Sequence, residues 1–190
     1  MMNKKLDRRK QYTRMVLKES LMELLREKII SSITIKELCQ KADINRSTFY
    51  SHYRDQFDLL QHIEDEILLE LQVTLKQYNH NEINETFAMT KYLLDYVYKR
   101  SADFLVLFSD HGNKAFQTRV IDTAQSIIIN SLKEDPQVIN IDKSKYMIYF
   151  VISGCIYVIE KWLMNGMKES PEEMTTIITE ISNRVILHSK

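Results

Sequence analysis

The stretch ADINRSTFYSHY, residues 42–53, gathers hydrogen-bonding side chains on one short predicted helix. A helix that only closed a hydrophobic core would hide its aromatic rings and scatter its hydroxyl groups. Groups of this kind suit the phosphates and base edges of a DNA major groove, where Arg46 can pair with guanine and the methyl group of Thr48 can meet thymine. The side chains predicted to point outward are Arg46, Ser47, Thr48, Tyr50, Ser51 and His52.

Two capped helices are predicted to position these side chains. Thr34 and Glu37 have the spacing of a capping box, which predicts a helix start followed by an apolar face. After a break at residues 43–44, Asn45 is the predicted N-cap of the second helix. With a longer supporting helix over residues 7–28, this pattern matches a helix-turn-helix at about residues 33–52. The inward positions of the second helix are expected to be Ile44, Phe49 and Tyr53.

The distribution of charge supports contact with a polyanion at this end of the chain. The 190 residues carry no net charge, but residues 1–54 hold 13 Lys and Arg against 6 Asp and Glu. The remaining residues hold the other 13 basic and 20 acidic side chains. A basic first quarter on an acidic body is the asymmetry expected of a nucleic-acid-binding protein. The run of basic residues before position 11 is open to two interpretations, a solvated arm or a contact to the DNA backbone or minor groove.

The rest of the chain is also predicted to be helical, so the fold class is all-α. Only three Gly and two Pro occur, and no strand-like alternation or internal repeat is present. Gly166 is a predicted C-cap, and SPEE at residues 170–173 is a strong helix start. The expected helices after the helix-turn-helix cover residues 56–78, about 85–100, 102–108, 115–133, 142–165 and 171–188.

The stretch TIKELCQKADINRSTFYSHYRDQFDLL resembles the DNA-binding signature of the TetR (tetracycline-repressor) family of bacterial transcriptional regulators. The similarity covers residues 8–68, and residues 69–190 would form the larger regulatory and dimerisation domain. The resemblance implies a homodimer with about nine helices in each chain. It also implies that Thr34 and Lys36 contact the DNA backbone and that Tyr50 and His52 grip phosphates. At the groove itself it places Asn45, Arg46, Ser47 and Thr48.

Two residues depart from the family pattern. Asp43 stands in the turn where the family commonly has glycine, so a residue that tolerates the turn less easily must form it. Gln56 stands where the family commonly has lysine, which removes one ionic contact to phosphate and lowers the salt dependence of binding by about one unit.

The C-terminal half resembles the family through helix count and the stretch EKWLMNGMKESPEEM, residues 160–174. By analogy, the helices at about 142–165 and 171–188 would form a four-helix bundle with a second subunit. The first of these helices is apolar nearly all round, which suits burial by its own domain and by a partner chain.

Aromatic residues in the C-terminal half have two interpretations. They belong to the core, or some of them line a pocket for a small-molecule effector. The candidate pocket residues are Tyr92, Tyr96, Phe104, Phe108 and Phe116.

Other function classes find little support in the sequence. No His pair has metal-ligand spacing, and no phosphate loop, nucleophile elbow or paired carboxylates occur, so neither a metal, a cofactor nor an enzyme activity is expected. The longest apolar run, residues 146–159, is too short for a bilayer span, and no secretion signal opens the chain. The two cysteines suit a reduced compartment, and we expect a cytoplasmic protein.

Two functional hypotheses follow. The first is a dimeric, sequence-specific DNA-binding regulator, a repressor released when a small apolar or mixed ligand enters the C-terminal domain. The second is a helical co-regulator whose C-terminal domain docks a protein partner over residues 80–140 and binds no small ligand.

Overall fold

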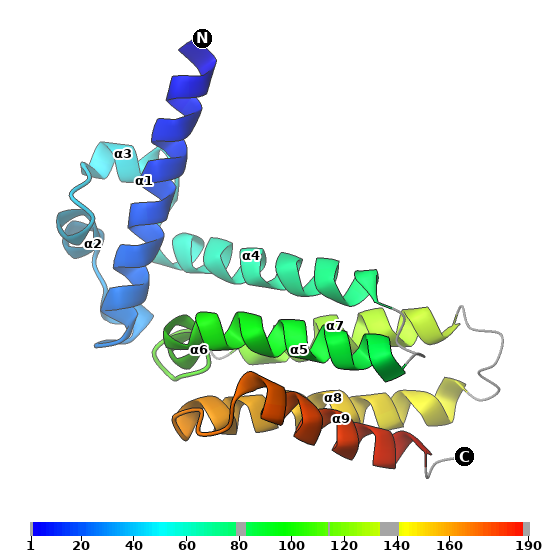
Figure 1. The fold of residues 1–190 in the computed structure, drawn as a ribbon. Coiled ribbons are helices and arrows are strands. Elements are labelled where there is room, and N and C mark those ends of the chain that lie inside the picture. The colour runs from blue at the N-terminus through cyan, green and yellow to red at the C-terminus, as the bar shows by residue number, and fades with distance from the viewer. Residues whose placement is uncertain (1, 79–82, 114, 134–140, 188–190) are drawn as a thin grey trace. The chain divides into compact units, whose positions relative to one another are not determined.

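The chain folds entirely into helices over the residues that the structure describes. This computed structural model describes residues 2–78, 83–113, 115–133 and 141–187, and no strand occurs within them (Figure 1). The expectation of an all-α fold is confirmed. The helices are α1 (Met2–Leu25), a short 3-10 turn (Ile30–Ser32), α2 (Ile35–Lys41), α3 (Arg46–Tyr50), α4 (Gln56–Gln77), α5 (Ile83–Lys99), α6 (Ser101–Leu107), α7 (Ala115–Lys133), α8 (Ile141–Met164) and α9 (Pro171–Leu187).

The helices divide into two compact units. The first contains Met1–Ile67 and Val106–Lys114, and the second contains Leu68–Leu105 and Ala115–Lys190. Residues 106–114 lie within the segment predicted as the C-terminal domain, and by their contacts they belong to the first unit. Helices α4 and α6 each contribute residues to both units.

Leucines of α1 provide one wall of the core of the first unit. Leu17, Leu21 and Leu25 recur every fourth residue and are completely buried, as expected of the inner stripe of an amphipathic helix. The helix begins earlier than predicted, at Met2, because the Lys- and Arg-rich segment before the stripe consists of good helix formers. Other fully buried residues of this unit include Ile33, Leu38, Phe49 and Leu59.

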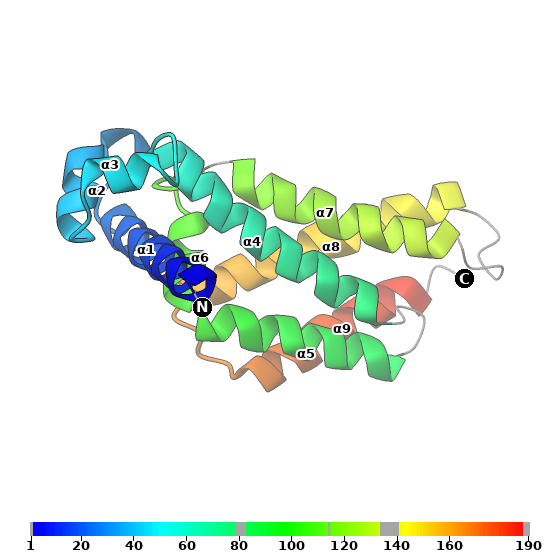
Figure 2. The ribbon, with the colours of Figure 1, turned by 90° about the horizontal axis from the view of Figure 1, so that it is seen from above.

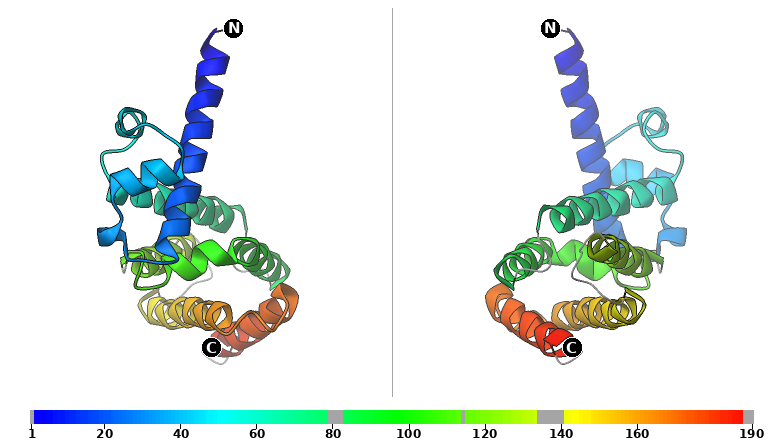
Figure 3. Two further views of the ribbon diagram at one scale, coloured as in Figure 1. Left: turned by 90° about the vertical axis from the view of Figure 1, so that its left-hand side faces the viewer. Right: turned by 90° about the vertical axis from the view of Figure 1, so that its right-hand side faces the viewer.

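The second unit is a bundle of long helices. Helix α5 packs against α9, α7 against α8, and α8 against α9, as Figures 2 and 3 show. One buried cluster joins α5, α8 and α9 through Leu94, Trp162, Met174 and Ile178. A second joins α4, α5 and α7 through Leu75, Met89 and Ala124, with Ile152 of α8 packed against it.

The turn between α8 and α9 is formed by local capping. Gly166 has φ +83°, and its N–H donates to the carbonyl of Leu163 while Met167 N–H donates to that of Trp162, which is a Schellman arrangement. At the start of α9, the Ser170 hydroxyl accepts from the Glu173 N–H (3.2 Å), and the Glu173 carboxylate accepts from the Ser170 N–H (2.8 Å). The predicted C-cap and capping box are therefore both confirmed.

Only part of α8 is buried by its own chain. Tyr146 and Phe150 are 67% and 70% exposed, and Tyr157 is 56% exposed. Residues Lys145–Met164 are long and apolar enough to cross a membrane by length and composition, a criterion that core helices of soluble proteins also meet. Among the residues that the structure describes, none covers this exposed aromatic side of α8.

Candidate nucleic-acid interface

Thr34 caps α2 as predicted, and the Glu37 carboxylate has a second partner outside the capping box. Thr34 has an extended backbone, and its hydroxyl accepts from the Glu37 N–H at 3.2 Å. The Glu37 carboxylate pairs with the Lys28 ammonium at 2.5 Å. The hydrogen bond from Lys28 lowers the pKa of Glu37, against the opposing effect of desolvation, and a backbone hydrogen bond from Thr34 also lowers it. Glu37 therefore ties α2 to the segment that follows α1.

The turn between α2 and α3 is made by Asp43 in a left-handed conformation. Its φ is +52°, which confirms that a non-glycine residue occupies the strained position. The N–H of Ile44 donates to the carbonyl of Cys39 at 3.0 Å and closes the turn. Ile44 itself is half-buried, and Cys39 is buried.

Replacing Asp43 with glycine is expected to raise the free energy of unfolding by about 0.5–1 kcal/mol, because glycine adopts positive φ without the steric cost of a side chain. Chemical denaturation followed by circular dichroism measures the change. Ala42→Gly is the matched control, since Ala42 has φ −78° and should lose stability on the same substitution. A destabilised Asp43→Gly protein would mean that the Asp43 side chain stabilises the turn.

Asn45 lies at the N-cap position of α3, but the prediction that its side chain caps the helix is wrong. The backbone is extended (φ −69°, ψ 145°) and its carbonyl accepts from the Phe49 N–H at 3.0 Å, while its side chain makes no cap hydrogen bond. An N-cap side chain stabilises a helix only when it turns back to the first amides. The exposed Asn45 amide group is thus left for contacts outside the chain.

The side chain of Phe49 anchors α3 in the core of the first unit. Phe49 is fully buried, Tyr53 is 4% exposed, and their ring centroids lie 6.0 Å apart. The Tyr50 ring meets the Phe49 ring edge to face, with centroids 5.5 Å apart, but is 58% exposed, an unusual position for an aromatic ring. Of the other residues predicted to face DNA, those that are exposed are Thr34, Lys36, Asn45, Arg46 and Ser47, and those that are half-buried are Thr48 and His52.

Helix α1 adds two cations beside α3 that the sequence interpretation did not connect with it. Burial lowers the pKa of His52, and the positive charges of Arg14 and Lys10 lower it further. Both basic residues are exposed. The proximity of these two cations to His52 could not be predicted from the sequence, because the whole of α2 and its turns separate Arg14 from His52 along the chain.

His52 predicts a pH dependence of binding to DNA. A phosphate beside His52 favours the protonated ring, so binding takes up a proton and should strengthen as the pH falls from about 7.5 to about 6. In the free protein, the lowered pKa of His52 has a separate effect on folding: the free energy of unfolding decreases as the pH falls. The stability contributed by neutral His52 is fully present above its unfolded value of 6.5 and decreases as the pH falls below it.

Fluorescence anisotropy at several pH values measures the linkage, with His52→Gln as the control. The variant should bind with a flatter pH dependence than the natural chain. An unchanged pH dependence in His52→Gln would remove His52 from the interface.

The start of α4 lacks a free cation. Asp55 caps the helix, its carboxylate accepting from the Asp58 N–H at 2.8 Å, as predicted. The Arg54 guanidinium donates to the Asp58 carboxylate at 2.8 Å and lowers the pKa of that group. The charge of Arg54 is thereby offset, so it does not replace the lysine absent at Gln56.

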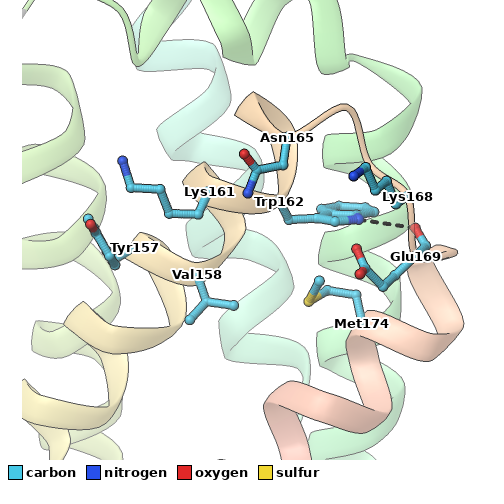
Figure 4. Close-up of a pocket in the computed structure, with 8 residues that line it drawn as sticks. All are labelled: Tyr157, Val158, Lys161, Trp162, Asn165, Lys168, Glu169 and Met174. Carbon is cyan, nitrogen blue, oxygen red and sulfur yellow. Dashed lines mark hydrogen bonds between the residues drawn. The ribbon is translucent and has the colours of Figure 1, made fainter.

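The five aromatic residues proposed for an effector pocket lie in different environments. Phe104 and Phe116 are buried, Tyr96 and Phe108 are half-buried, and exposed Tyr92 donates a hydrogen bond to Glu70 at 3.0 Å. One cavity of about 730 Å³ lies between α4 and α7, and another of about 560 Å³ lies at the turn between α8 and α9 (Figure 4). None of the five residues lines either of these two cavities. Within the described ranges, no group of three or more His, Cys, Asp or Glu side chains has a metal-binding arrangement.

Comparison with known proteins places the chain among transcriptional regulators. Residues 84–184 match a TetR-family model described as "Transcriptional regulator C-terminal region". The uncharacterized HTH-type transcriptional regulator YxbF of Bacillus subtilis (strain 168) is 41% identical over 51 residues, which are 27% of this chain and only 13% of that protein.

Two solved structures share the fold across nearly the whole chain. A TetR transcriptional regulator from Streptococcus agalactiae 2603V superposes with a TM-score of 0.64 at 21% identity, covering 93% of this chain and 96% of that one. FadR from Bacillus subtilis, solved in complex with stearoyl-CoA, has a TM-score of 0.60 at 12% identity, covering 88% and 96%. These proteins are regulators rather than enzymes. With a regulator family model covering more than half of its length and a helix-turn-helix at its start, the chain belongs to the TetR family of DNA-binding transcriptional regulators.

Proposed function

We propose that the protein is a homodimeric, cytoplasmic repressor that leaves its operator when a small molecule binds the C-terminal domain. The observation that carries the DNA-reading part is α3, which buries Phe49 and leaves Arg46, Ser47 and Tyr50 exposed. Lys10 and Arg14 extend the positive surface beside it. Proteins of the family bind DNA operators as dimers, and many respond to small molecules.

We assign three roles to the residues of the interface. Thr34 and Lys36 would contact the DNA backbone from α2, and Tyr50 and His52 would grip phosphates from α3. Base edges would be read by the residues at the start of α3, namely Asn45, Arg46, Ser47 and Thr48. Arg46 is the strongest candidate for sequence discrimination, because its guanidinium can donate two hydrogen bonds to guanine.

Dimerisation would bury the exposed apolar sides of α8 and α9. A monomeric protein rarely leaves several large apolar side chains on one helix in water. Gly154 lies on this side of α8, and beyond the adjoining backbone of α8 itself no described atom lies within 4 Å of the position that its Cβ would take, so a partner helix could approach closely there. The exposed residues are Tyr146, Tyr149, Phe150 and Tyr157 of α8 and Ile177 and Ile181 of α9.

Effector control would act through the spacing of the two heads. The reader helices of a dimer must enter successive major grooves, about 34–36 Å apart. A ligand that binds more tightly to a dimer with a different spacing shifts the population away from the DNA-bound form. The cavity between α4 and α7 and the five aromatic residues named above are the candidate effector regions. A small organic effector is compatible with this fold, since FadR from Bacillus subtilis, which has a similar fold, was solved in complex with stearoyl-CoA.

A second candidate is a co-regulator that binds a protein partner through the C-terminal domain. It is favoured by Leu69 and Val73, which lie one turn apart on α4 and are 60% and 49% exposed. Gln56, which stands where the family commonly has a phosphate-binding lysine, also fits a head with reduced affinity for DNA. If a small molecule displaced the purified protein from DNA with no other protein present, such a partner would not be required.

Selection of bound sequences from a random duplex library tests the proposed function. A dimer of helix-turn-helix heads should enrich a palindromic or nearly palindromic motif whose half-sites are one helical turn, or a multiple of it, apart. Enrichment of a single asymmetric half-site would contradict the dimeric mode of reading. Recovery of no motif would contradict sequence-specific binding.

A further inference from the structure

The cavity at the turn between α8 and α9 has an apolar floor. It occupies about 560 Å³, within the usual size of a small-molecule site. Trp162 and Met174 are almost fully buried beneath it, and Val158 completes the floor (Figure 4). The Trp162 indole N–H donates to the Glu169 carbonyl at 3.0 Å, and the ring stacks on Tyr98 at a centroid distance of 6.2 Å. The floor is therefore rigidly held.

Two ammonium groups stand at the rim of this cavity. Lys161 lies over the Tyr157 ring, 4.9 Å from its centroid, and 4.0 Å from the sulfur of Met164. Lys168 belongs to the turn after the Schellman cap. In the part of the chain that the structure describes, no carboxylate forms an ion pair with either ammonium. Asn165 adds an exposed amide between them.

One carboxylate also lines the cavity. Glu169 lies on its α9 side, so the rim carries two positive charges and one negative charge. The net charge of the rim is positive and favours an anion, but the negative charge of Glu169 weakens the attraction. This gives the site an internal test, because removing the negative charge and removing a positive charge should have opposite effects.

We infer that this cavity binds an organic anion, a carboxylate carried on an apolar body. The positive charges of Lys161 and Lys168, which lie on opposite sides of Trp162 (Figure 4), would attract the carboxylate from the two ends of the rim. The Asn165 amide would donate to it, and Val158, Trp162 and Met174 would contact the apolar part. The site is separate from the candidate effector regions of the proposed function, since it shares no residue with the α4–α7 cavity or the five aromatic residues.

The fluorescence of Trp162 reports on this site directly, because it is the only tryptophan in the chain. Octanoate and octanol are matched probes that differ in the charged head and share the apolar chain. Octanoate should change the emission of Trp162 in a saturable, salt-sensitive manner, and octanol should need a concentration about tenfold higher. Since Tyr157 also belongs to the proposed dimer face, the titration is run at one protein concentration, at which light scattering measures the association state.

Three substitutions at the rim distinguish a binding site from an incidental hollow. Lys161→Gln and Lys168→Gln should each weaken octanoate binding about threefold, as expected for single exposed charge interactions. Glu169→Gln should strengthen it by a similar factor. Lys99→Gln changes an exposed lysine of α5 outside the cavity and should have no effect. All four positions are exposed, so circular dichroism should show unchanged folding.

The inference fails if octanol binds as well as octanoate, if octanoate leaves the emission of Trp162 unchanged, or if Glu169→Gln weakens binding. It also fails if Lys99→Gln matches the effect of the rim lysines, since the attraction would then be general. None of these outcomes bears on binding to DNA, which anisotropy measures independently.

Discussion

Phe150→Glu is expected to convert the dimer to a monomer and to weaken operator binding by at least about 100-fold, because the second head then no longer binds as part of the same molecule. Phe150 is 70% exposed on α8, so the substitution removes little packing within the chain. In a dimer the same residue would lie between two apolar faces, where an unpaired carboxylate is strongly destabilising. Ile152→Glu is a less selective choice, since Ile152 also packs against the cluster of Leu75, Met89 and Ala124.

Analytical ultracentrifugation measures the association state of Phe150→Glu, and circular dichroism checks its folding. Leu69→Glu is the matched control, because it places the same charge at a similarly exposed apolar position on α4. That variant should remain dimeric. A folded, fully dimeric Phe150→Glu protein would show that α8 does not form the subunit interface.

Arg46→Ala and Tyr50→Ala are expected to weaken DNA binding in two different ways. Loss of Arg46 should relax the preference for guanine at one position of each half-site, with a loss of discrimination of about 1–3 kcal/mol. Loss of Tyr50 removes a contact to phosphate and should weaken binding to all sequences alike. Both side chains are exposed, and circular dichroism checks the folding of Tyr50→Ala, because the Tyr50 ring meets the buried Phe49 ring edge to face.

Competition between operator variants and random duplexes measures the two effects. In Arg46→Ala, the affinity for operators mutated at one symmetric pair of positions should approach that for the natural operator. In Tyr50→Ala, the ratio of the affinities should be preserved while both decrease. Equal effects of the two substitutions on operator and random DNA would remove Arg46 from base recognition.

Much of the fold follows from local rules that the sequence displays. The capping box at Ser170 and Glu173, the C-cap at Gly166 and the N-cap at Asp55 each depend on residues within a few positions of one another. The burial of Phe49 on the inner side of α3 follows from helical periodicity. Positions of this kind could be predicted because a single turn of helix determines them.

Features that depend on distant residues were not predictable in the same way. Glu37 pairs with Lys28 as well as belonging to the capping box of α2, and only the folded chain brings Lys28 and Glu37 together. The loop after α6 joins the first unit because the His111 carbonyl accepts from the Ile30 N–H at 3.0 Å and the His111 Nδ1 lies 2.9 Å from the Leu25 carbonyl. Bonds between residues so far apart in sequence leave no periodic signal.

The central claim is that the basic head reads a specific DNA sequence, and fluorescence anisotropy across a salt series tests it most directly. The probes are the DNA upstream of the protein's own gene and a random duplex of equal length. The account predicts tight binding to the upstream DNA that random competitor cannot displace at equal concentration. It also predicts a logarithmic salt slope of about −5 or steeper, as expected for six or more neutralised phosphates in a dimer. Equal affinity for the two duplexes at every salt concentration would contradict specific recognition at this site and would favour the partner-binding alternative.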